Sequence, residues 1–113
     1  MLVMAGLLLT SFLCRPALAQ ATTGEALAKK MQCLACHQVD KRRVGPAFTV
    51  VAERFVEREG GEDYLAYAVR HGGRGSWGAI PMPEQPHVNE ENAKLLAQWI
   101  LSLAPAKSVD APE

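Results

Sequence analysis

Apolar residues recur every three to four positions in four segments of the chain, which is the spacing of helices that bury one face. The first predicted helix opens at the capping box Thr22-Thr23-Gly24-Glu25 and directs Leu27, Ala28 and Met31 inward. The second predicted helix runs from Phe48 to about Glu59 and ends at a pair of glycines.

The two later helices flank a stretch rich in glycine and proline. One runs from Glu62 to His71, and the other follows Asn89, an N-cap residue that two glutamates reinforce. The stretch between them, residues 72–86, is too irregular for any element. Because no segment has the alternation of a convincing strand, the pattern predicts an all-α fold. The apolar residues expected to share one face of the last helix are Leu95, Leu96, Trp99, Ile100 and Leu103.

The N-terminal segment has a different pattern and is predicted to be a signal peptide. Residues 2–14 are almost entirely apolar but too few to span a bilayer, and Ala17-Leu18-Ala19 before Gln20 matches a cleavage site. The segment lacks the usual basic residues near its start, so an uncleaved N-terminal anchor is the alternative. We therefore expect a cleaved signal peptide at 1–19, a folded domain at 20–104 and a flexible tail at 105–113.

Composition limits the function of the exported domain. The 113-residue chain has 12 basic and 12 acidic residues, so its near-neutral charge argues against nucleic acid as a partner. Cleavage would leave only two cysteines, Cys33 and Cys36, with none spare for a structural disulfide. A domain of this size has a small core, and its fold often needs a covalent cross-link or a bound cofactor for stability.

A covalently attached haem would stabilise the fold in this way, and the sequence Cys33-Leu34-Ala35-Cys36-His37 is typical of a covalent haem c site. Each cysteine can form a thioether to one haem vinyl group, and the adjoining histidine then ligates the iron. A structural zinc site would need two further Cys or His ligands at matching spacing. A redox dithiol would need a βαβ context, whereas the flanks here are helical. The motif predicts one haem c per chain, with His37 as an axial ligand.

Met82 is the candidate for the second axial ligand. Pro81 and Pro83 hold its backbone stiff and extended, so its thioether is presented with little loss of conformational entropy. Ligation by His and Met is the electron-transfer arrangement, and the soft sulfur raises the reduction potential. The alternatives are that Met82 only fills a gap in the core, or that His71 or His87 ligates the iron.

Taken together, these motifs resemble class I cytochromes c, and more narrowly the small bacterial cytochrome c-551/c-552 type. The resemblance covers nearly the whole mature domain. It implies about four helices wrapped around one haem, with the first and last helices crossing. It also implies a soluble periplasmic one-electron carrier rather than an enzyme. The matching segments are Gln32–His37, Val44–Ala47, Gly75–Gly78, Ile80–Pro83 and Ala97–Ile100.

The resemblance also implies supporting roles for three residues. The Pro46 carbonyl would accept a hydrogen bond from the His37 ring and so fix its tautomer. The Trp77 indole N–H would reach a haem propionate, although an ordinary core tryptophan is the alternative. Gln85 would donate to the Met82 sulfur or to a propionate, or else face solvent.

The chain departs from the resembled family at two positions. Ala28 stands where relatives often place an aromatic residue between the terminal helices, so Leu96 or Trp99 would have to compensate. Ala68 stands where relatives often have an arginine near a propionate. The cations then left near the propionates are Arg70, Arg74 and His71.

The expected partners are periplasmic or membrane-bound redox enzymes. We expect no small-molecule substrate, and we expect the carrier to be a monomer. The basic run Lys41-Arg42-Arg43 is either a solvated turn or part of a docking face. Two alternatives remain open. One is a dedicated subunit of a larger redox complex, and the other is a haem enzyme or gas sensor with an open sixth position.

Overall fold

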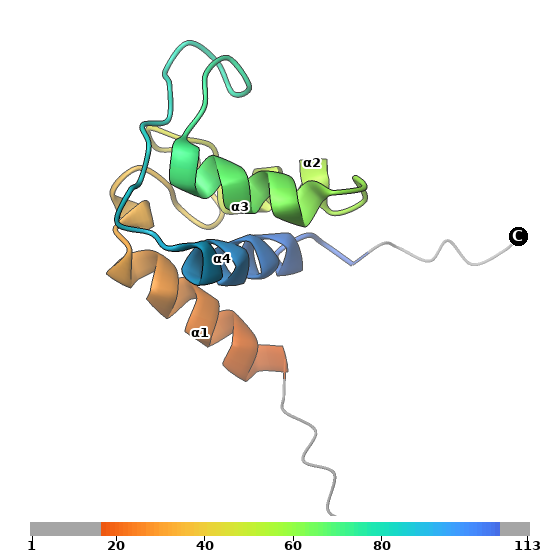
Figure 1. Cartoon of the computed structure of the whole chain (residues 1–113). Helices are drawn as coiled ribbons and strands as arrows, with labels where there is room; N and C mark the ends of the chain where they lie inside the picture. The colour runs from red at the N-terminus through yellow and green to blue at the C-terminus, as the bar shows by residue number, and fades with distance from the viewer. Residues whose placement is uncertain (1–16, 107–113) are drawn as a thin grey trace, which may run out of the picture.

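The computed structural model describes residues 17–106 and places α4 at the centre of a helical fold (Figure 1). α4 packs against each of the other three α-helices. Among the described residues no strand forms, and an isolated bridge joins Gly73 to Met82. The all-α prediction is therefore confirmed. The elements in chain order are α1 (Ala17–Lys30), the 3-10 helix η1 (Cys33–Ala35), α2 (Phe48–Phe55), α3 (Gly61–His71) and α4 (Glu90–Ser102).

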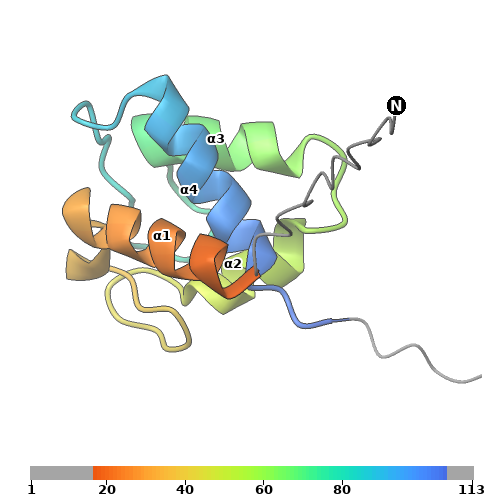
Figure 2. The same ribbon diagram turned by 90° about the horizontal axis from the view of Figure 1, so that it is seen from below.

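The helices α1 and α4 cross, as Figure 2 shows from below, and Gly24 of α1 lies at the crossing against Trp99 of α4. A Cβ atom on Gly24 would overlap the side chain of Trp99, so the two helices approach closely only because this position has no side chain. Ala28, one turn further along α1, is completely buried. The expected crossing is present, and the large Trp99 side chain occupies the space against α1.

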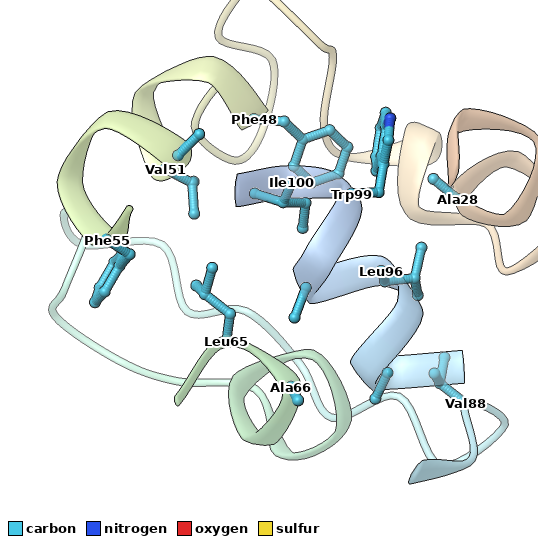
Figure 3. Close-up of a cluster of buried hydrophobic side chains, with 13 residues drawn as sticks. Ala28, Phe48, Val51, Phe55, Leu65, Ala66, Val88, Leu96, Trp99 and Ile100 are labelled. Atoms are coloured by element: carbon cyan, nitrogen blue, oxygen red, sulfur yellow. The ribbon is translucent and has the colours of Figure 1, made fainter. Parts of the chain in front are cut away.

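The hydrophobic core lies between α4 and the other helices (Figure 3). Phe48 and Trp99 meet edge to face with ring centroids 5.3 Å apart, which is a favourable aromatic geometry. Leu95 does not join this core and is 47% exposed, so its predicted place on the inner face was wrong. At 100° per residue, Leu95 falls outside the arc of the buried residues of α4. Those buried residues are Ala93, Leu96, Ala97, Trp99 and Ile100.

Two helix boundaries also differ from the prediction. The first helix begins at Ala17 rather than at the capping box from Thr22, because the intervening residues are mostly alanine, the best helix former. The second helix ends at Phe55 rather than near Glu59. The chain must turn there because Gly61 lies against the Phe55 carbonyl, where a Cβ atom would collide.

The start of the last helix agrees with the sequence. The Asn89 side chain accepts a hydrogen bond from the Asn92 amide at 2.8 Å, which is the predicted N-cap. Within residues 17–106, no helix has both the length and the apolar character needed to cross a membrane. Most of the predicted signal peptide and the tail from residue 107 lie outside the described residues.

Candidate haem site

The two cysteines and the histidine of the predicted haem motif lie in one tight turn after α1. The amides of Cys36 and His37 both donate to the Cys33 carbonyl, at 3.2 and 3.0 Å. Gln32 precedes this turn with φ of +64°, a left-handed conformation that redirects the chain out of α1. Cys36 is exposed, whereas Cys33 is half-buried, and that burial raises the pKa of the Cys33 thiol. Both thiols are free for covalent attachment.

The His37 ring is held in one orientation by contacts on several sides. Its Nδ1 lies 2.8 Å from the Pro46 carbonyl oxygen, the hydrogen bond that the family resemblance implies. Because a carbonyl only accepts, Nδ1 carries the proton and Nε2 keeps a lone pair for a metal. The ring also stacks on Phe48, with centroids 4.8 Å apart and planes 17° from parallel.

Gly45 is required on the third side of this ring. A Cβ atom there would lie 2.5 Å from His37 Cε1, closer than any real contact. The turn that carries Gly45 is tied to the cysteine motif, since the amides of Val44 and Gly45 donate to the Cys36 carbonyl at 3.1 and 2.8 Å. The Gly45-Pro46 pair is therefore both a turn and part of the histidine's immediate surroundings.

Met82 is anchored through its backbone to the end of α3. Its amide and carbonyl pair with the carbonyl and amide of Gly73, at 2.9 and 3.0 Å. Gly72, with φ of +69°, lets the chain pass so close to the Met82 carbonyl that a Cβ atom would collide with it. From the sequence, Gly72 and Gly73 belong only to the irregular stretch that follows the third predicted helix. They also hold the strand-like segment that presents the methionine.

His37 and Met82 line the same apolar cleft. The cleft contains about 1010 Å³ of space between its atoms, a figure that includes its part open to solvent. An imidazole nitrogen and a thioether thus share a large apolar space with a free cysteine at its edge. The donor set and the cleft both fit a covalently bound haem. Residues from the helices and loops around it include Pro46, Phe48, Leu65, Ala68, Trp77 and Pro81.

Trp77 forms part of the cleft wall, and the guanidinium of Arg54 packs against its ring. The Arg54 guanidinium lies over the Trp77 ring at 4.6 Å from its centroid, and Arg54 Nη1 donates to the Ser76 carbonyl at 2.8 Å. Sequence reasoning missed this contact, because it joins α2 to a loop more than twenty residues away. The contact of Trp77 with a propionate stays a prediction.

Gln85 lies in the loop just after the methionine. Its Nε2 donates to the Pro83 carbonyl at 3.1 Å, and its backbone amide donates to the Arg70 carbonyl at 2.8 Å. The side chain therefore stabilises the Met82 loop in the structure, and its hydrogen bond to sulfur or propionate remains untested.

The competing histidines lie apart from the cleft. His71 stacks on Tyr67 with centroids 4.2 Å apart, and neither residue lines the cleft. His87 Nε2 lies 2.9 Å from the Met31 carbonyl oxygen and thereby ties the loop after Met82 to the end of α1. The structure brings Met82, and neither of these histidines, into the cleft with His37.

Comparisons with known proteins agree with this architecture. A family model described as "Cytochrome c" matches residues 21–104. A cytochrome c-551 of Stutzerimonas stutzeri is 53% identical over 89 residues, covering 79% of this chain and 83% of that protein. A cytochrome c-552 of Hydrogenobacter thermophilus is 48% identical, covering 70% of this chain and 80% of that protein. The crystal structure of Nitrosomonas europaea cytochrome c552 superposes with a TM-score of 0.69 at 44% identity, covering 70% of this chain and 98% of that one.

Proposed function

Because the chain belongs to the cytochrome c family, we propose that it is a soluble periplasmic electron carrier with one haem ligated by His37 and Met82. The matching members of this family, cytochromes c-551 and c-552, are small monohaem electron-transfer proteins and not enzymes. The chain carries one covalently attached haem c, and Cys33 and Cys36 fit the attachment motif.

The observation that carries the axial assignment is that His37 and Met82 line one cleft. The bound haem supplies one-electron redox chemistry, and a thioether ligand raises its reduction potential. The His37–Pro46 hydrogen bond leaves Nε2 as the nitrogen available for iron. If His37 and Met82 both hold the iron, a substrate would have no position at which to coordinate, so the surrounding residues would serve to hold these two side chains and to exclude water.

The same ligands support the rigid behaviour that a carrier needs. Met82 is fixed by paired backbone hydrogen bonds to Gly73, and the His37 ring is fixed by Pro46 and Phe48. Little rearrangement would then accompany a change of oxidation state. Electrons would pass to partners at the mouth of the cleft, where Val44 and Ile80 are 47% and 61% exposed. Such a small apolar patch suits brief contacts between a monomeric carrier and larger redox enzymes.

Binding of carbon monoxide to the reduced holoprotein tests the filled coordination sphere. We expect slow and incomplete binding, because the gas must displace the Met82 sulfur. Rapid binding to the wild-type protein would instead indicate an open sixth position, as in a haem enzyme or a gas sensor. A fixed stoichiometric complex on purification would favour the dedicated-subunit alternative.

Export to the periplasm is supported by the apolar residues 2–14 and by the Ala17-Leu18-Ala19 pattern before Gln20. N-terminal sequencing of the mature protein from a periplasmic extract tests it directly. A mature chain that begins at Gln20 is expected. Recovery of the haem protein in the membrane fraction with residues 1–19 intact would contradict cleavage and favour the anchor.

A further inference from the structure

One residue of the basic run Lys41-Arg42-Arg43 differs from its neighbours in position. Arg42 lines the cleft, whereas Lys41 and Arg43 do not. Among the described residues that line the cleft, Arg42 is the only arginine, lysine, aspartate or glutamate. The sequence alone does not separate these three cations, because they follow one another in a single turn.

The guanidinium of Arg42 lies close to Gly78, in the loop between α3 and α4. Its Nη2 lies 3.8 Å from the position that a Cβ atom on Gly78 would take. Gly78 belongs to the segment that carries Trp77 and Ile80, which line the cleft with Arg42. Gly78 has φ of +118°, a conformation that favours glycine, so no side chain there keeps the guanidinium away.

The turn that bears Arg42 is fixed by backbone hydrogen bonds. The Arg43 amide donates to the Gly45 carbonyl at 3.1 Å, and the Val44 amide donates to the Cys36 carbonyl at 3.1 Å. The backbone of Arg42 therefore belongs to the same hydrogen-bonded turn that positions His37. The cations named from the sequence as candidates near the propionates, Arg70, Arg74 and His71, do not line the cleft.

We propose that Arg42 faces the haem and raises its reduction potential. This inference rests on the haem occupying the cleft, as in the proposed function. Reduction adds one negative charge to the cofactor, and a nearby fixed cation stabilises the more negative state by Coulomb attraction. All three cations of the run are exposed to solvent, so water screens part of this attraction. Arg42 acts more strongly than Arg43 because it lines the cleft and therefore lies nearer to the cofactor. Arg42 would therefore tune the cofactor, leaving Lys41 and Arg43 for contacts with partners.

The test is the midpoint potential of the holoprotein measured by spectroelectrochemistry in wild type, Arg42→Gln and Arg43→Gln. Both substitutions remove one positive charge from adjacent residues, so they are matched. We expect Arg42→Gln to lower the potential and Arg43→Gln to leave it close to the wild-type value. Arg42→Lys keeps the charge and should recover most of the wild-type potential. If Arg42→Gln does not mature, the pair Arg42→Met and Arg42→Lys gives the same comparison of neutral and charged side chains.

Equal shifts in Arg42→Gln and Arg43→Gln would overturn the proposal, because they would show a general surface-charge effect. An unchanged potential in Arg42→Gln would overturn it as well. The far-red absorption of the methionine-ligated ferric haem is recorded for each variant, so that loss of Met82 is not mistaken for loss of charge. Rapid carbon monoxide binding by the wild type would contradict the axial assignment and leave the Arg42 comparison intact.

Discussion

At the scale of single residues, the site depends on glycines and carbonyls as much as on the ligands themselves. His37 has a defined tautomer because Pro46 offers it only an acceptor, and a defined position because Gly45 has no side chain. Met82 is held through backbone contacts with Gly73, and Gly72 allows the close approach. The chemical groups could be predicted from the sequence, whereas these close approaches depend on distances that only the folded chain defines.

Substitution Gly45→Ala tests the packing around the histidine. The added methyl group would press on the His37 ring, so the ring must shift or the hydrogen bond to Pro46 must break. We expect a loss of about 1–3 kcal/mol in the free energy of unfolding of the holoprotein, the usual cost of overpacking. Thermal or denaturant unfolding measures it.

Gly73→Ala is the control for that experiment. A Cβ atom on Gly73 meets nothing within 4 Å, and the residue does not have positive φ. This variant should unfold close to the wild type. Equal stability of Gly45→Ala and wild type would contradict the close contact with His37.

At the scale of elements, the helices could be predicted from periodicity, but their ends and exact faces could not. The N-cap of α4 was predicted correctly because Asn89 makes a local hydrogen bond. The end of α2 depends on the return of the chain to Phe55, and the exposure of Leu95 depends on which arc of α4 meets its neighbours. Both are properties of tertiary packing, so the local pattern does not contain them.

Substitution Gly24→Ala tests the crossing of α1 and α4. Alanine in place of glycine in an open helix stabilises it by roughly 0.5–1 kcal/mol. Here the methyl group would overlap Trp99, so we expect the opposite sign, a destabilisation of about 1–3 kcal/mol. Equilibrium unfolding of the holoprotein measures the sign. A stabilised variant would show that the helices do not meet at Gly24.

Substitution Arg54→Ala tests the connection between α2 and the cleft wall. It removes the hydrogen bond to Ser76 and the contact with the Trp77 ring, both at a solvent-exposed site. We expect a loss of about 1–2 kcal/mol in stability and faster hydrogen exchange in residues 75–80. Arg58→Ala is the control, since Arg58 lies over the Phe55 and Tyr64 rings and not over Trp77. Unchanged exchange in Arg54→Ala would contradict the connection.

At the scale of the whole molecule, the fold is organised so that one cleft receives groups from distant parts of the chain. His37 comes from the turn after η1, Met82 from the loop before α4, and Leu65 and Ala68 from α3. The sequence predicted the ligand pair from a combination of motifs, because a methionine between two prolines points to the iron only when a haem attachment motif precedes it. It did not predict that Arg42 alone of its basic run lines the cleft, because adjacent side chains in a turn point in different directions.

The central claim is that His37 and Met82 ligate the haem iron, and the absorption spectrum of the oxidised holoprotein tests it most directly. We expect a weak far-red band from methionine-ligated ferric iron in the wild type, the loss of this band in Met82→Ala, and a lower reduction potential in that variant. Met31→Ala is the matched control, since Met31 is the other methionine remaining after residue 19, and it should keep the band. A band that persists in Met82→Ala would contradict the account.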